Sequence, residues 1–159
     1  MGNIGREVAR LATAFGCEVC YYSTSGVERK EEYKSVSLND LLTQSDVASI
    51  HCPLNERTRD LIGKEQLSMM KPSAILINVA RGGIVDEGAL TEALNAHRLR
   101  GAALDVFTSE PLRTSPLYSL NDPYRLLASP HNAWSPVEAI DRLIGCIAQN
   151  IAEYVQDER

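Results

Sequence analysis

Short apolar runs alternate along this chain with segments of helical periodicity, and this alternation restricts the fold more than any other feature of the sequence. The runs are too short, and too rich in β-branched and aromatic residues, to be helices, so each predicts a buried strand. They cover residues 17–22, 47–51, 74–79, 102–106 and 125–129. Strand and helix alternate at steps of roughly 25 to 30 residues, a spacing typical of right-handed crossovers in a parallel sheet. The sequence therefore predicts an α/β fold, a doubly wound parallel sheet with helices on both faces.

The intervening helices have recognisable ends. Residues 4–15 place apolar side chains at helical spacing, and Gly16 follows where helices often end in glycine. Ser37 and Asp86 precede further helical patterns as N-cap residues. Residues 135–138 read Ser-Pro-Val-Glu, a capping box with proline at the first helical position. We expect a long final helix to begin there.

Composition restricts the partners of the chain. The 159 residues favour a single domain, and hydrophobic and charged fractions of 44% and 23% are ordinary for a globular protein. The net charge is -5 and there is no basic stripe, so nucleic acid is not expected as a partner. No apolar stretch approaches the roughly 20 residues that span a bilayer, so we expect no membrane partner and a cytoplasmic location.

The four cysteines are expected to be free thiols, because a chain of this size buries a sufficient core without disulfides. They are Cys17, Cys20, Cys52 and Cys146. The first two form a Cys-x-x-Cys pattern within an expected strand, where side chains three positions apart face opposite sides. No second pair of ligands accompanies them, so no metal site is predicted.

The first chemical signal is Gly2-Asn3-Ile4-Gly5 at the start of the first helix. It matches the second half of a Gly-x-Gly-x-x-Gly fingerprint, in which Gly2 lets the backbone approach a pyrophosphate and the helix N-terminus supplies amide hydrogens. Two glycines in an N-terminal tail are the alternative interpretation. The strand and glycine that precede this half of the fingerprint are not in the sequence. We therefore expect residues 1–159 to form a dinucleotide-binding domain that is incomplete at its N-terminus and lacks its first strand.

The segment after the first expected strand bears on the choice of cofactor. Dinucleotide folds often place an acidic residue there to bind the ribose hydroxyls of NAD, whereas residues 22–25 of this chain read Tyr-Ser-Thr-Ser. Without a carboxylate, the site does not repel the 2′-phosphate of NADP. The candidates to bind that phosphate are Ser23, Thr24, Arg29 and Lys30. We therefore favour NADP use, exclusive or shared, while loop hydroxyls beside a backbone-held NAD are the alternative.

Polar residues follow three of the expected strands. The segments are Asn-Val-Ala-Arg-Gly-Gly-Ile-Val-Asp at 78–86, Leu-Asp-Val-Phe-Thr-Ser-Glu-Pro at 104–111 and Ser-Pro-His-Asn-Ala-Trp at 129–134. Because the carboxyl ends of parallel strands form the ligand crevice of an open sheet, we expect Arg81, Glu110 and His131 to line one cleft. Taken singly, they are better explained as a solvated charge, a loop carboxylate and a turn histidine. Their convergence favours a shared site.

These motifs, with Gly2 to Gly5 and His-Cys-Pro-Leu-Asn-Glu-Arg-Thr at 51–58, resemble the cofactor domain of the D-isomer-specific 2-hydroxyacid dehydrogenases over nearly the whole chain. The resemblance implies an oxidoreductase that interconverts a small D-2-hydroxy acid and its 2-oxo acid with NAD or NADP. It places Arg81, Glu110 and His131 at catalytic positions. It also places Asp105 against the nicotinamide carboxamide. The substrate domain of that family is not in this sequence, so the chain alone is expected to be inactive.

The chemistry of the three side chains agrees with these positions. The planar guanidinium of Arg81 suits the carboxylate of a 2-oxo acid. The imidazole of His131 can donate a proton to the substrate carbonyl during reduction and take it back during oxidation. Glu110 would orient that ring.

Further cofactor contacts are expected from loop residues that follow the strands. They are His51, Cys52, Pro53, Thr58, Val79, Ala80, Arg81 and His131. The first three would shape the adenosine pocket through their backbone. For Thr58, a phosphate or ribose contact and a solvated loop hydroxyl are equal alternatives.

Trp134 resembles the residue found in the glycerate dehydrogenase and hydroxypyruvate reductase branch, so hydroxypyruvate/glycerate or glyoxylate are the favoured substrates. A tryptophan packed at a domain or dimer boundary is the alternative.

Two other functions stay open: a dinucleotide-sensing binding module like the dehydrogenase-like corepressors, and a non-catalytic fragment. Because the missing strand exposes sheet edges and apolar surface, we expect a homodimer.

Overall fold

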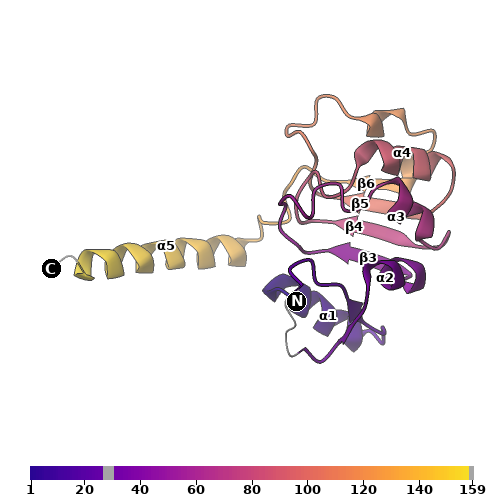
Figure 1. Cartoon of the computed structure of the whole chain (residues 1–159). Coiled ribbons are helices and arrows are strands. Elements are labelled where there is room, and N and C mark those ends of the chain that lie inside the picture. The colour runs from indigo at the N-terminus through magenta and orange to yellow at the C-terminus, as the bar shows by residue number, and fades with distance from the viewer. Residues whose placement is uncertain (27–30, 158–159) are drawn as a thin grey trace.

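The computed structural model describes residues 1–26 and 31–157 (Figure 1). The strands are β1 (Cys20–Tyr21), β2 (Lys34–Ser35), β3 (Val47–Ile50), β4 (Ile75–Asn78), β5 (Gly101–Leu104) and β6 (Leu126–Ala128). The α-helices are α1 (Asn3–Ala14), α2 (Leu38–Gln44), α3 (Lys64–Met69), α4 (Glu87–Asn95) and α5 (Val137–Asp157). Two 3-10 helices, η1 (Pro116–Ser119) and η2 (Pro123–Arg125), lie between β5 and β6. All the strands predicted from sequence are present.

The strands pair in parallel, which confirms the predicted α/β class. β3, β4, β5 and β6 lie side by side in that order, and β1 pairs with β2. Over the described part of the chain these are two separate ladders, so the sheet is divided between β1 and β3. The sequence does not predict β2, because both of its residues are exposed and carry no apolar pattern.

The core fills one face of the four-stranded sheet. Leu76 of β4 and Leu104 of β5 are buried there, at alternate positions along their strands. They belong to one cluster with Leu42 of α2, Leu67 of α3 and Leu90 of α4. Full burial of each leucine stabilises the fold by about 1.5–3 kcal/mol. The core therefore fastens α2, α3 and α4 to the sheet that carries the loops described below.

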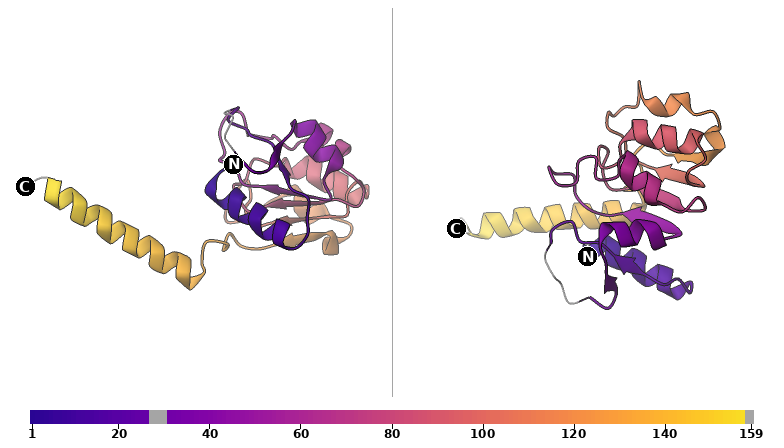
Figure 2. Two further views of the ribbon diagram at one scale, coloured as in Figure 1. Left: turned by 90° about the horizontal axis from the view of Figure 1, so that it is seen from below. Right: turned by 45° about the vertical axis from the view of Figure 1, so that its right-hand side comes forward.

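The opposite face of the four-stranded sheet is only partly covered in the described part of the chain. Ile77 of β4 is half-buried there, and Leu127 of β6 is 72% exposed. Helix α1 is amphipathic as predicted, yet among its residues only Ala9 is buried, and Phe15, which follows the helix, is 87% exposed. Helix α5 projects away from the body (Figure 2), so its apolar residues cover neither face of the sheet.

Most of the predicted helix ends are confirmed. The Ser37 side chain accepts a hydrogen bond at the start of α2, and the Asp86 carboxylate accepts two at the start of α4. Gly16 has a φ of 83°, the left-handed conformation expected of a glycine after a helix. The predicted capping box is not formed. The Ser135 hydroxyl instead donates to the Asn132 carbonyl at 2.7 Å, and α5 begins two residues later.

Several features do not occur among residues 1–26 and 31–157. No helix in this part of the chain is long and apolar enough to cross a lipid bilayer. No group of three or more histidine, cysteine, aspartate or glutamate side chains is arranged to hold a metal ion. All four cysteines have free thiols.

Candidate active site

The carboxyl ends of β4, β5 and β6 lie next to one another at one edge of the sheet. Asn78 at the end of β4 is the register partner of Leu104, and Leu104 is the partner of Ala128 at the end of β6. The segments that carry Arg81, Glu110 and His131 therefore leave the sheet at the same edge.

A short hydrogen bond joins two of these side chains. Glu110 Oε2 lies 2.6 Å from His131 Nδ1, and Glu110 Oε1 accepts a hydrogen bond from the Phe107 amide at 2.9 Å. The hydrogen bonds from His131 and then from Phe107 lower the pKa of Glu110, against the opposing effect of burial. The carboxylate is thus favoured in its charged form beside Nδ1, which orients the imidazole. The two side chains are 38% and 35% exposed, so a ligand can reach the pair.

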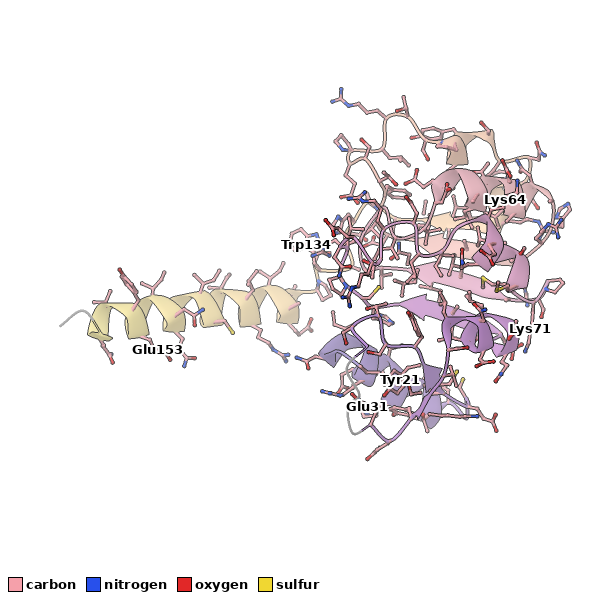
Figure 3. The ribbon with its side chains drawn as sticks, viewed as in Figure 1. Tyr21, Glu31, Lys64, Lys71, Trp134 and Glu153 are labelled. Atoms are coloured by element: carbon pink, nitrogen blue, oxygen red, sulfur yellow. The ribbon has the colours of Figure 1, made fainter. Side chains whose placement is uncertain are left out.

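The backbone at His131 has a conformation that few side chains adopt. Its φ is 53°, in the left-handed region. Such a conformation costs of order 1–3 kcal/mol, and surrounding contacts must maintain it. The His131 amide donates to the Ser129 carbonyl at 3.1 Å, and the indole Nε1 of Trp134 donates to the His131 carbonyl at 2.7 Å. Trp134 lies where the body meets α5 (Figure 3), is 62% exposed and braces the histidine peptide.

Asp105 holds the same loop from the end of β5. Its Oδ1 accepts hydrogen bonds from the Ser129 hydroxyl at 2.5 Å and the Asn132 amide at 3.0 Å, and Oδ2 accepts one from the Ala133 amide at 2.9 Å. Burial alone would raise the pKa of Asp105, but these donors, led by Ser129, lower it. The carboxylate therefore ties the loop on both sides of His131. The expected contact with a nicotinamide carboxamide stays a prediction, for which Oδ2 keeps an acceptor position.

Asn78 shapes the turn that carries Arg81. This asparagine is 1% exposed, accepts a hydrogen bond from the Ala80 amide at 3.0 Å and donates one to the Arg81 carbonyl at 2.9 Å. Val79 and Ala80 lie within the turn, and Val79 is 39% exposed. The Arg81 side chain is exposed, and its Nη1 donates to the Ala80 carbonyl at 2.6 Å. A guanidinium has five N–H donors, so this bond leaves it able to hold a carboxylate.

Gly82 joins the turn of Arg81 to the loop of Glu110. A Cβ at Gly82 would lie 1.8 Å from the Phe107 carbonyl oxygen and 2.6 Å from the Thr108 nitrogen. The peptide between these residues therefore packs directly on the glycine backbone, in space that any side chain would need. This contact brings two of the predicted catalytic segments together.

The start of α1 offers uncapped amides. Gly2 is the N-cap, no side chain caps the helix, and its first turn holds no acidic residue. A Cβ at Gly2 would meet nothing within 4 Å. The amides of Asn3, Ile4 and Gly5 are among those that a helix leaves without a backbone partner, and the positive end of the helix dipole lies there. These residues therefore fit the pyrophosphate of a dinucleotide cofactor.

The end of β3 lies beside this helix start. A Cβ at Gly5 would lie 3.7 Å from the His51 Cβ, and His51 Nε2 lies 2.9 Å from the Ser49 hydroxyl. Burial lowers the pKa of His51 and raises the pKa of the Cys52 thiol, so both neutral forms are favoured. The expected backbone contribution of His51, Cys52 and Pro53 to an adenosine pocket stays a prediction.

Thr58 is fully buried. Its hydroxyl donates to the Pro53 carbonyl at 2.7 Å and accepts from the Asn55 amide at 2.8 Å, so it closes the turn after β3. The hydroxyl is therefore not solvated. A direct contact with a ribose or phosphate would require this turn to open.

Ser23 and Thr24 lie just beyond β1, after Tyr22, and are half-buried. The Ser23 hydroxyl lies 3.2 Å from that of Ser25. Arg29 and Lys30, the other candidates for a 2′-phosphate, lie outside the described residues. The binding of that phosphate stays a prediction.

Three residues that shape this edge lie within the predicted segments, but the sequence gives them no role of their own: Asn78, Gly82 and Ser129. Asn78 is the single polar residue of a strand that otherwise reads Ile-Leu-Ile, and this pattern is a usable signal of a buried, hydrogen-bonded amide. Gly82 and Ser129 act on segments distant in sequence, and no local pattern reveals such contacts.

Comparisons with known proteins add an independent observation. Residues 1–133 match the family described as D-isomer specific 2-hydroxyacid dehydrogenase, NAD binding domain. A putative 2-hydroxyacid dehydrogenase of Haemophilus influenzae is 42% identical over 98% of this chain and 50% of its own length. A glyoxylate reductase of Aeropyrum pernix is 42% identical over 98% of this chain and 47% of its own length. A glycerate dehydrogenase of Methylorubrum extorquens is 39% identical over 97% of this chain and 48% of its own length. The chain spans about half the length of these curated relatives.

Two solved structures have the same fold. An acyclic imino acid reductase in complex with NADPH and D-Arg superposes with a TM-score of 0.87 at 35% identity, over 98% of this chain and 49% of that one. The NAD-complexed form of a D-isomer specific 2-hydroxyacid dehydrogenase from Lactobacillus delbrueckii ssp. bulgaricus superposes with a TM-score of 0.88 at 28% identity. The match covers 98% of this chain and 51% of that one.

Proposed function

Because this chain belongs to the D-isomer-specific 2-hydroxyacid dehydrogenase family through its NAD-binding domain, we propose that it is the cofactor-binding part of an NAD(P)-dependent oxidoreductase. The reaction is the interconversion of a small D-2-hydroxy acid and its 2-oxo acid. The observation that carries this proposal is the 2.6 Å hydrogen bond between Glu110 and His131 at the carboxyl edge of the sheet. A histidine oriented by a carboxylate is a recurring arrangement for general acid–base catalysis.

His131 is the proton donor for reduction and the acceptor for oxidation. Glu110 engages Nδ1, so the other ring nitrogen, Nε2, exchanges the proton with the substrate oxygen. Glu110 is thus a positioning partner of the histidine.

Arg81 holds the substrate carboxylate. Its fork of donors matches the two carboxylate oxygens, and such pairs fix a planar 2-oxo acid in one orientation. The turn that carries Arg81 contacts the loop that carries Glu110 at Gly82, which supports a shared substrate position.

The cofactor is a nicotinamide dinucleotide held at the start of α1. When bound, its nicotinamide ring supplies or accepts the hydride. The uncapped amides after Gly2 bind the pyrophosphate, and the space at Gly2 permits close approach. We assign the carboxamide of the ring to Asp105 and the adenosine pocket to the residues after β3.

NADP, exclusively or together with NAD, is the proposed cofactor form. The support is the Tyr-Ser-Thr-Ser segment at 22–25, which lacks the carboxylate that would repel a 2′-phosphate. The NADPH complex of the imino acid reductase and the NAD complex of the Lactobacillus dehydrogenase are consistent with either form.

Hydroxypyruvate/glycerate or glyoxylate is the proposed substrate. Relatives named glyoxylate reductase and glycerate dehydrogenase support this choice. Trp134 supports it physically, because an indole bonded to the His131 carbonyl restricts the size of a substrate at the histidine. We further propose a homodimer, and a cytoplasmic location in which the four free thiols stay reduced.

The direct test is a fluorescence titration of this chain with NADH and with NADPH at fixed salt, followed by addition of hydroxypyruvate. Binding of at least one cofactor is expected, and no binding of either would contradict the proposal.

Ser23→Asp should weaken NADPH binding on the order of tenfold or more relative to NADH, because like charges repel. Equal loss of affinity for NADH and NADPH would show that Ser23 does not bind the 2′-phosphate.

The catalytic roles are tested in the complete enzyme. His131→Gln should mainly lower kcat, whereas Arg81→Ala should mainly raise KM for hydroxypyruvate. Near-normal turnover of the His131 variant would refute its acid–base role.

A further inference from the structure

Glu87, the first residue of α4, hydrogen-bonds to the loop of Glu110 at two points. Its Oε1 accepts a hydrogen bond from the Thr108 amide at 2.7 Å, and its Oε2 accepts one from the Ser115 hydroxyl at 2.5 Å. These two donors stand on either side of Glu110 in sequence. Glu87 is half-buried, so its bonds to the loop are partly shielded from water.

The capping of α4 does not require the Glu87 carboxylate. The neighbouring Asp86 accepts the hydrogen bonds of the Gly88 and Ala89 amides and serves as the N-cap. Glu87 is therefore available to reach outward while the positive end of the helix dipole favours its negative charge. Hydrogen bonds to a charged acceptor are roughly twice as strong as neutral ones.

The contacts of Glu87 continue to the candidate catalytic pair. Thr108 belongs to the peptide that packs on Gly82, and the preceding amide, that of Phe107, donates to Glu110 Oε1 at 2.9 Å. Two consecutive amides are thus each held by a different glutamate. Fixing Thr108 fixes the Phe107 amide, and this amide sets one oxygen of the carboxylate whose other oxygen contacts His131.

Helix α4 also holds the far end of the same connection. The side-chain Nδ2 of Asn95 donates to the Ser119 carbonyl at 3.1 Å, and Asn95 Oδ1 accepts from the Asn121 backbone amide at 2.8 Å. The helix is itself fastened by Leu90 and Leu94 in the core. It is therefore a rigid support to which the segment after β5 is attached at both ends of the helix.

We infer that Glu87 is a positioning residue that holds the Thr108–Ser115 segment so that Glu110 meets His131. Its significance for catalysis rests on the proposed function, but the positioning itself does not. Without the carboxylate, the segment loses two anchors and Glu110 loses its fixed orientation. The His131 ring then loses the partner at Nδ1 in part of the population.

The test is a long-range proton–nitrogen NMR correlation of the imidazole rings in the nitrogen-labelled chain, which reports hydrogen bonding at each ring nitrogen. His131→Gln identifies the His131 signals, and Glu110→Gln defines their position when the carboxylate partner is lost. Glu87→Ala should move the His131 Nδ1 signal in the direction of the Glu110→Gln spectrum. Glu87→Gln should move it less, because its amide oxygen still accepts one of the two bonds.

Glu92→Gln is the matched control. It removes a carboxylate from the same helix, where Glu92 is exposed and paired with Lys64 at 2.9 Å. It should leave the His131 signals unchanged. Circular dichroism and urea unfolding of each variant separate a local change from loss of the fold, and Glu87→Gln carries the test if the alanine variant does not fold.

An unchanged His131 spectrum in folded Glu87 variants, together with a clear change in Glu110→Gln, would overturn the inference. The readout requires neither cofactor nor turnover. Failure of the wild-type chain to bind NADH or NADPH would instead count against the proposed function alone.

Discussion

The strained residue of the site is the histidine itself. His131 has a φ of 53°. Trp134 helps to maintain this conformation by donating to the His131 carbonyl. Asp105 does so by accepting hydrogen bonds from the two amides that follow the histidine. Backbone strain of this kind is tolerated where neighbouring contacts restrict the alternatives. The orientation of the imidazole is therefore a property of the whole loop.

Gly82→Ala tests the contact between the turn of Arg81 and the loop of Glu110. The added methyl group would overlap the Phe107 carbonyl, so the loops must move apart. We expect a loss of about 1–3 kcal/mol in the free energy of unfolding, as for other overpacked sites. Urea unfolding monitored by circular dichroism measures it.

Gly145→Ala is the matched control for that substitution. A Cβ at Gly145, within α5, meets nothing within 4 Å. Alanine should stabilise that helix by up to about 1 kcal/mol, because glycine loses more backbone entropy there. Equal effects of the two substitutions would show that the close approach at Gly82 has no energetic consequence.

At the scale of elements, the loop after β6 is held by a carboxylate at the end of β5. The pKa of Asp105 is lowered in the folded protein, so the unfolded chain binds the proton more readily. Its stabilising contribution is full above the ordinary aspartate pKa of about 4 and is lost as the pH falls through the lowered folded value. Acid should therefore loosen the loop that carries His131.

Asp105→Asn is the test of this dependence. At pH 7 the substitution should cost about 1–3 kcal/mol, because three donors lose a charged acceptor. Between roughly pH 5 and pH 2 its stability should fall less steeply with acid than that of the wild type. Urea unfolding at several pH values measures how the free energy of unfolding changes with pH in the variant and in the wild type. Glu31, whose pKa the Arg6 side chain and other partners lower to about 2, titrates in both proteins. Parallel slopes would contradict a native-state shift at Asp105.

At the scale of the whole molecule, apolar surface is left uncovered on two elements. Helix α5 projects from the body (Figure 1). It carries a row of exposed apolar residues, and Ile4 of α1 and Phe15, which follows that helix, are also exposed. The row on α5 comprises Leu143, Ile144, Ile147, Ile151 and Val155. Continuous apolar faces of this kind are typical of protein interfaces.

We therefore expect the chain to self-associate. Light scattering coupled to size-exclusion chromatography should give a mass above the 17.5 kDa of one chain. The double substitution Ile144→Lys with Ile151→Lys should weaken the association, because it places charges within the apolar row. Gln149→Lys, on the polar side of the same helix, should not. A stable species of single-chain mass in the wild type would refute the prediction.

The sequence by itself determined the elements and the identity of the candidate site. Strand periodicity, the Ser37 and Asp86 caps and the turn at Gly16 depend on neighbours a few residues away, so they can be predicted without the fold. Parallel pairing then follows from strand and helix alternation, which explains why Arg81, Glu110 and His131 are predicted to leave the sheet at one edge. Two local features were not predicted correctly. Strand β2 is too short and too exposed to show an apolar pattern, and the Ser135 hydroxyl donates to the preceding Asn132 carbonyl and does not cap α5.

Only the tertiary structure decided how these residues are held. The close packing of Gly82 on the Phe107 peptide, the anchoring of Thr108 by Glu87 and the engagement of Asp105 by Ser129 all join segments from different strands. The burial of Thr58 and the partial exposure of the second face of the sheet likewise depend on contacts between segments distant in sequence. The physical reason is that periodicity and capping are short-range properties of the chain. The geometry of an active site is instead set by hydrogen bonds and steric exclusion between loops that meet only after the sheet has formed.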